Sequence, residues 1–207
     1  MMKRVLVVNN RDSFVYNLVE YLRHLVGDSM DVCLVDNLYT SEWKKERLLS
    51  YSHVLFSPGA GVPSEYPGMM QLLGDIVAYA HAGEDVPSVL GVCLGHQAIA
   101  TFFGAKLRQM EAPKHGHMSQ LRLVDPAFFL WNGVPVNSEI ARYHSWVIEE
   151  KSLPISLEAL AYDEDNNIMA IQHMEYPIYG VQFHPESILT KYGMCMLESW
   201  IKKELPK

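Results

Sequence analysis

Cys93 lies between an apolar run and a stretch with helical spacing, a setting that favours a reactive thiol. Residues 89–92 are predicted to form a buried strand, and residues 94–103 a helix that ends at Gly104. Glycines two residues to either side of Cys93 are typical of a nucleophile elbow, a sharp turn that exposes its central side chain. The free N–H groups at the start of the helix favour a thiolate, and that of Leu94 can receive an oxyanion. We predict a catalytic nucleophile, with a buried core cysteine as the alternative.

A histidine and a glutamate near the end of the chain offer the base that a thiol nucleophile needs. His184 and Glu186 are separated by a proline in the run Gly180-Val-Gln-Phe-His-Pro-Glu-Ser187. On an extended segment both side chains would lie on the same side, so the carboxylate can orient the imidazole. The imidazole would then take the proton of Cys93. A surface histidine at a strand end is the alternative interpretation.

A glycine-rich segment, Ser57-Pro-Gly-Ala-Gly61, follows another predicted strand. It lacks the Gly-Lys-Ser/Thr ending of a nucleotide-binding P-loop, so we expect its N–H groups to face a substrate oxygen. The polar segment 142–146 is interpreted as a loop that holds substrate, with packing as an equal explanation for Tyr143 and Trp146. The segment 114–117 is interpreted as a binding loop or a hairpin. A zinc site is a less favoured alternative, because the spacing of its candidate ligands matches no compact pattern: Cys93, His96, His115 and His117.

The first half of the chain alternates apolar runs with amphipathic stretches. Strands are predicted at 5–9, 32–35, 53–56 and 89–92. Helices are predicted at 14–25 (capped by Asp12 or Ser13 and ended by Gly27), 41–49, 69–81 and 94–103. Such repeated strand–helix units imply a mostly parallel open sheet with helices on both faces. Sites in these sheets lie at the carboxyl ends of the strands, where the glycine loop and Cys93 both fall.

The second half is richer in strands. Strands are predicted at 106–110, 120–124, 157–162, 168–173 and 178–183, with a hairpin turn at Asn166-Asn167 and a last helix at 191–203. Antiparallel pairs are expected among these strands. No linker separates the two halves, so the fold class is α/β and residues 1–207 are expected to form a single domain.

Composition narrows the class of protein. The chain has 207 residues, of which 49% are hydrophobic and 20% charged, both ordinary for a globular protein. A formal net charge of −7 argues against a nucleic-acid or anionic-membrane partner, because both attract clustered Lys and Arg. Three cysteines with no paired spacing, and neither a signal peptide nor a membrane-spanning run, predict a cytoplasmic protein.

Four motifs together resemble the triad-type (class I) glutamine amidotransferases. They are Gly91-Val-Cys-Leu-Gly-His-Gln97, Ser57-Pro-Gly-Ala-Gly61, Arg142-Tyr-His-Ser145 and Gly180-Val-Gln-Phe-His-Pro-Glu-Ser-Ile-Leu-Thr190. The last two are similar in particular to the branch that aminates chorismate, namely the small subunits of anthranilate synthase and aminodeoxychorismate synthase. The resemblance covers nearly the whole chain and implies a flavodoxin-like core.

The resemblance also implies a role for each matching residue. Cys93 would attack the side-chain amide of glutamine, with His184 as general base and acid and Glu186 orienting it. A γ-glutamyl thioester would form and be hydrolysed to glutamate. The residues implied to bind glutamine or its oxyanion are Gly59, Ala60, Gly61, Leu94, Gln97, Ser145 and Trp146.

By the same resemblance, ammonia would pass to a chorismate-binding synthase large subunit, which is expected to use Mg. The product would be anthranilate, for tryptophan, or 4-amino-4-deoxychorismate, for folate. No cofactor or metal is expected on this chain. Two alternatives are an amidotransferase for a purine or carbamoyl-phosphate pathway, and a silent regulatory subunit that only binds glutamine.

Five positions depart from the usual motifs of the family. Ala60 replaces a proline between the loop glycines, and near the first strand Asn9 replaces an aspartate and Arg11 a tyrosine. His117 replaces a lysine and Trp146 a leucine. None of these is a proposed triad residue, so we expect the glutaminase chemistry to be retained.

Overall fold

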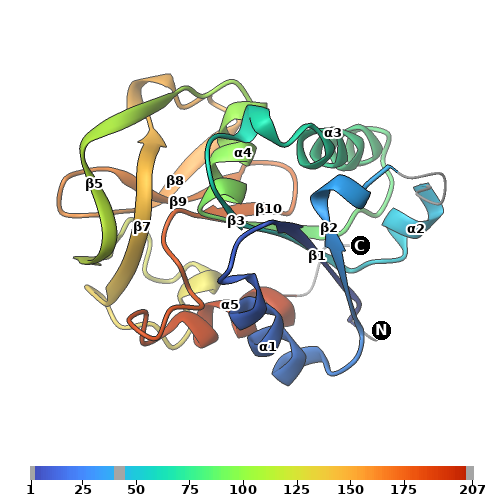
Figure 1. The fold of residues 1–207 in the computed structure, drawn as a ribbon, viewed down its shortest axis with the longest axis horizontal. Coiled ribbons are helices and arrows are strands. Elements are labelled where there is room, and N and C mark those ends of the chain that lie inside the picture. Colours follow the sequence, from blue (N-terminus) through green and yellow to red (C-terminus); the bar gives the residue numbers. More distant parts are fainter. Residues whose placement is uncertain (1–2, 40–44, 204–207) are drawn as a thin grey trace.

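The computed structural model describes residues 3–39 and 45–203 (Figure 1). Within these ranges the main layer is an eight-stranded sheet of order β2-β1-β3-β4-β10-β9-β8-β6. Its parallel part consists of β2 (Met30–Leu34), β1 (Val5–Asn10), β3 (His53–Gly59), β4 (Ser88–Val92) and β10 (Ile178–Val181). Its antiparallel extension consists of β9 (Ile168–His173), β8 (Leu157–Tyr162) and β6 (Arg122–Leu123). The predicted α/β class is confirmed.

Helices cover both faces of this sheet. They are α1 (Val15–Val26), α2 (Lys45–Leu49), α3 (Pro67–His81), α4 (Leu94–Phe102) and α5 (Gly193–Lys202). Figure 1 shows α1 and α5 on one face and α3 and α4 on the other. Because successive strand residues point to opposite faces, Val5 and Val7 pack with α1 and α5, whereas Leu6 and Val8 pack with α3 and α4. Each face therefore has its own hydrophobic core.

A separate two-stranded sheet lies beside the main one. It pairs β5 (Leu107–Gln120) with β7 (Glu139–Ile148) in antiparallel register. The ladder is interrupted twice, and Gly116 sits at the second interruption with φ +67°. Residues 114–117 lie within β5, so both the loop and the hairpin expected there were wrong, and residues 142–146 lie within β7 rather than in a loop. The strand predicted at 106–110 instead continues to Gln120. Most side chains of β5 are exposed, so this strand lacks the apolar alternation that would have revealed it.

Several element boundaries differ from the predicted ones. The strand predicted at 120–124 is reduced to β6, and the strand predicted at 178–183 ends at Val181. Of the helix predicted at 41–49, only α2 can be compared, because residues 40–44 lie outside the described ranges. The last helix begins at Gly193 rather than 191.

Local turn chemistry agrees better with the prediction. Gly27 ends α1 with φ +62°, and Gly104 follows α4 with φ +102°. Asp12 precedes α1 and accepts the backbone N–H of Phe14 at 2.7 Å, although Phe14 itself occupies the cap position. Asn166 adopts φ +60° in the turn between β8 and β9. In the part of the chain that is described, every helix falls short of the length and apolarity needed to cross a membrane.

Candidate active site

Cys93 occupies the sharp turn between β4 and α4. Its backbone has φ +52° and ψ −99°, a conformation that residues other than glycine rarely adopt. Its N–H donates to the carbonyl of Val181 in β10 at 2.8 Å, and its own carbonyl accepts the N–H of Gln97 at 3.0 Å. These two bonds hold the strained turn between the sheet and the helix. The elbow expected from the sequence is present.

The two glycines that flank the elbow are required by close packing. A Cβ built on Gly91 would lie 2.4 Å from the backbone of Gly95. A Cβ built on Gly95 would lie 2.4 Å from the carbonyl oxygen of Phe56 in β3. The start of α4 can therefore approach the sheet only if both positions lack a side chain.

His184 and Glu186 are joined in a buried pair. Nδ1 of His184 donates to Oε1 of Glu186 at 2.6 Å, and the two residues are 3% and 2% exposed. Burial by itself lowers the pKa of His184, but the interactions with Cys93 and Glu186 outweigh it and hold the pKa well above its usual value. Nε2 makes no conventional hydrogen bond within the described residues, which leaves that nitrogen for the thiol of Cys93.

The position of His184 differs from the expected one. The strand β10 ends at Val181, so His184 lies in a bent segment rather than on the strand. Its N–H donates to the carbonyl of Ala141 in β7 at 3.0 Å. The hydroxyl of Thr190 donates to the carbonyl of His184 at 2.7 Å and accepts the N–H of Ala141 at 3.0 Å. The second sheet thus holds the histidine, which the sequence pattern did not indicate.

Two aromatic rings pack against the imidazole of His184. Tyr143 meets the His184 ring edge-to-face at a centroid distance of 5.1 Å, and Phe14 does so at 6.0 Å. The two aromatic rings also lie 5.5 Å apart. These neighbours restrict the rotation of the imidazole. Tyr143 belongs to the segment 142–146 that the sequence associated with substrate, whereas Phe14 was not assigned to the site.

A cavity of about 280 Å³ opens in front of Cys93. The expected residues that line it are Gly59, Ala60, Gly61, Gln97, Ser145 and Trp146; the others are His115, Tyr143 and His144. Leu94 lies outside this lining and is 1% exposed, with its side chain packed beside Gly59. The structure therefore brings the glycine loop, the elbow and β7 to one cavity, of a size that suits a small amino acid.

A buried ion pair supports the wall that β7 contributes. The guanidinium of Arg142 pairs with Asp163, and both side chains are fully buried. Nε of Arg142 donates to Nε2 of His144 at 3.1 Å, and Nδ1 of His144 lies 3.0 Å from the carbonyl of Trp146. Burial, together with the nearby Arg142 charge, lowers the pKa of His144 to about 3. The ring is therefore neutral and carries its proton on Nδ1.

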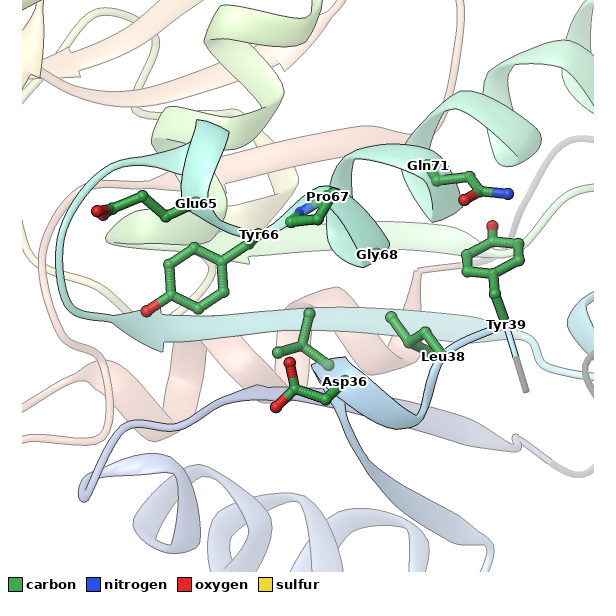
Figure 2. A pocket seen from close by; sticks show the side chains of 9 residues that line it. Asp36, Leu38, Tyr39, Glu65, Tyr66, Pro67, Gly68 and Gln71 are labelled. Atoms are coloured by element: carbon green, nitrogen blue, oxygen red, sulfur yellow. The ribbon is translucent and has the colours of Figure 1, made fainter.

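The glycine loop is tied to a helical turn outside the cavity. The hydroxyl of Tyr66 donates to the carbonyl of Ala60 at 2.9 Å, and Glu65 accepts the N–H of Val62 at 2.8 Å. Tyr66 and Glu65 also line a second cavity of about 310 Å³, shown in Figure 2 with Asp36 at its lower edge. Arg11 forms an exposed ion pair with this Asp36.

The metal alternative has no ligand set in residues 3–39 and 45–203, where no three His, Cys, Asp or Glu side chains gather closely enough to hold an ion. His96 is completely buried against Gly180, and burial lowers its pKa to about 3. His115 lines the cavity, whereas His117 lies on β5 and is exposed. His96, His115 and His117 therefore lie in three different environments and do not converge on one site.

The fold and the site together define a class of protein. A cysteine on an elbow at the carboxyl end of a parallel strand, beside a histidine–carboxylate pair, is the arrangement of α/β proteins that transfer acyl groups through a thiol. The sequence profile of "Glutamine amidotransferase class-I" matches residues 6–203. The chain belongs to this family.

Two relatives align with this chain over nearly its full length. The chain is 38% identical to "Anthranilate synthase component 2" of Saccharolobus solfataricus, covering 98% of this chain and 100% of that protein. It is 36% identical to "Aminodeoxychorismate/anthranilate synthase component 2" of Bacillus subtilis, covering 96% and 95%. Among solved structures, a glutamine amidotransferase from Thermotoga maritima superposes with a TM-score of 0.75 at 16% identity, covering 98% of this chain and 100% of that chain. That likeness supports the fold.

Proposed function

We propose that this chain is the glutaminase subunit of a synthase that aminates chorismate. The proposal rests on the position of Cys93. This residue lies beside the buried His184–Glu186 pair, at the edge of a cavity that suits a small amino acid. The names of the two relatives, one of which serves both aminodeoxychorismate and anthranilate synthase, support chorismate as the acceptor on a partner subunit.

In the proposed reaction the thiolate of Cys93 attacks the side-chain carbonyl carbon of glutamine. The carbonyl oxygen becomes an oxyanion, which the N–H groups of Gly59 and Leu94 receive. Protonated His184 then gives its proton to the amide nitrogen, the C–N bond breaks, and ammonia leaves a γ-glutamyl thioester. Water loses a proton to His184 and attacks the thioester, so that glutamate departs and the thiolate returns.

The cavity lining supports the glutamine-binding role of every expected residue except Leu94, which lies outside it. The loop 59–61 and Ser145 face the same space as Cys93, and Gln97 closes it from α4. Nε2 of Gln97 already donates to the carbonyl of Trp146, so its side-chain oxygen is the atom available to the ammonium group of glutamine. The buried carboxylate of Glu186 keeps the imidazole in the orientation that the proton transfers need.

A partner subunit would bind chorismate and receive the ammonia. Direct transfer is expected because ammonia released into neutral water is mostly protonated and no longer nucleophilic. In this proposal the partner carries the Mg, and this chain uses no cofactor of its own. Cys33, Cys93 and Cys195 are all described and are free thiols, which supports a cytoplasmic location.

The test is to substitute Cys93→Ala and assay the complex with its synthase subunit. We expect the variant to lose amination driven by glutamine and to keep amination driven by added ammonium salt. Fluorescence or chromatography of the product identifies the aminated ring. The control is Cys195→Ser, which should retain both activities. Equal loss of both activities in Cys93→Ala would show that the residue supports assembly, and wild-type glutamine use would exclude it as the nucleophile.

A further inference from the structure

Gln182 lies between the nucleophile and a residue of the glutamine cavity. It is the first residue after β10, and it is completely buried. Its Nε2 donates to the sulfur of Cys93 at 3.6 Å, and its Oε1 accepts Nε2 of Gln97 at 3.1 Å. Its backbone N–H donates to the carbonyl of Met169 in β9 at 2.8 Å. Both ends of the amide are therefore used inside the site.

The orientation of this amide follows from a chain of hydrogen bonds that starts at Arg142. A guanidinium can only donate, so Nε2 of His144 is an acceptor and Nδ1 carries the proton. The carbonyl of Trp146 accepts from Nδ1 of His144 and from Nε2 of Gln97. The NH₂ group of Gln97 is thereby fixed, and it must find an oxygen on Gln182.

A reversed Gln182 amide would place two NH₂ groups against each other and an oxygen against sulfur. Both contacts would be unfavourable in a site where Cys93 is only 5% exposed and water cannot replace the lost partners. The observed orientation instead presents an N–H group to the sulfur. His184 faces the same sulfur from the bent segment after β10.

We propose that Gln182 is a further catalytic group, which stabilises the thiolate of Cys93 through its amide N–H and holds Gln97 towards glutamine through its carbonyl. The inference rests on the proposed glutaminase function for its effect on turnover. Hydrogen bonds to charged acceptors are stronger than those to neutral ones, so this N–H counts most when the sulfur is ionised. The two ends of one side chain thus act on the nucleophile and on substrate binding.

Two substitutions separate the effect of the Gln182 amide N–H from the effect of its carbonyl oxygen. Gln182→Glu keeps an oxygen for Gln97 but replaces the donor to sulfur with a carboxylate, which repels a thiolate, whereas Gln182→Met loses both contacts. We expect kcat for glutamine hydrolysis to fall about tenfold or more in each variant, the size expected for a lost hydrogen bond to a charged group. We expect KM to stay near wild type in Gln182→Glu and to rise in Gln182→Met, because only the latter releases Gln97.

The rate of Cys93 alkylation by iodoacetamide, without glutamine, provides a readout that does not depend on turnover. Both Gln182 variants should react more slowly than wild type at neutral pH. The matched control is Gln172→Met in the adjacent strand β9, where the amide donates to Glu158 on the surface. This control should keep wild-type kinetics and alkylation.

The melting temperature of each full-length variant shows whether a substitution at Gln182 affects only the active site or the stability of the whole fold. Slower alkylation with a melting temperature near that of wild type supports the proposal, even if the chain proves not to be a glutaminase. Wild-type kcat and alkylation in Gln182→Met would overturn it. Parallel losses of alkylation and melting temperature in Gln182→Met would also overturn it, since they would show that the residue only supports the fold.

Discussion

The backbone N–H of His184 donates to the carbonyl of Ala141 at 3.0 Å, which joins the segment after β10 to the two-stranded sheet. This contact brings the imidazole to Cys93, which lies at the end of a different strand. Ala141 is three residues from His144 and four from Ser145, whose strand also lines the cavity. One strand therefore positions the base and shapes the space for the substrate.

Cys93 should be the first of the three thiols to react with a γ-electrophilic glutamine analogue. It alone lines the cavity beside an imidazole, whereas burial raises the pKa of the Cys33 thiol. Peptide mass mapping over a time course, with glutamine as competitor, measures the order of labelling. His184→Ala should slow the reaction and Cys195→Ser should not. Equal labelling of Cys33 or Cys195, or no protection by glutamine, would contradict the assignment.

Glu186→Gln should lower kcat and change how stability depends on pH. The folded-state pKa of His184 lies above its unfolded value, so its stabilisation is complete below about pH 6.5 and disappears as pH rises through the folded-state pKa. Removing the carboxylate lowers that folded-state pKa.

The melting temperatures of wild type and Glu186→Gln should therefore differ more at about pH 6 than at about pH 9. A matched substitution is Glu158→Gln, which changes an exposed carboxylate of β8. The difference in melting temperature between Glu158→Gln and wild type should not be larger at the lower pH. A constant difference for Glu186→Gln across the range would show that the carboxylate does not raise the pKa of His184.

Tyr66→Phe should impair turnover more than stability. Its hydroxyl donates to the carbonyl of Ala60, and without it the glycine loop is freer to leave the orientation that receives the oxyanion. We expect kcat/KM to fall several-fold, corresponding to roughly 0.5–1.5 kcal/mol for one neutral hydrogen bond.

Tyr39→Phe serves as the comparison for this loop, because Tyr39 lines the same second cavity but donates to Asp75. Steady-state kinetics of both variants measure the effect. Equal losses of kcat/KM in the two variants would argue against a specific role for the contact between Tyr66 and Ala60.

Gly95→Ala should displace the elbow. The added methyl group would meet the carbonyl oxygen of Phe56 at 2.4 Å, and such overpacking costs about 1–3 kcal/mol. Gly74→Ala in α3 is the control, since its methyl group would lie 3.5 Å from the ring of Phe102, an ordinary contact. We expect the melting temperature and the rate of glutamine hydrolysis to fall in Gly95→Ala and to stay near wild type in Gly74→Ala. Wild-type behaviour of that variant would show that α4 can move away from β3 without harm.

The sequence alone was sufficient to predict the elbow and the parallel half of the sheet. The apolar run before Cys93, the flanking glycines and the helical spacing after it are local features, and each is determined by residues a few positions apart. The pairing of His184 with Glu186 was also predictable from their spacing, although the expectation of a strand there was wrong. Short-range geometry controls all of these features.

Only the tertiary structure showed the ladder of β5 and β7 and the contacts that depend on it. The strand β5 is mostly exposed and carries no apolar period, and the irregular ladder pairs residues that lie between 19 and 41 positions apart. The contacts of Gln182 with Cys93 and Gln97 span still longer separations, 89 and 85 residues. Such contacts form because the sheet order places β10 beside β4, and no local pattern in the chain encodes that neighbourhood.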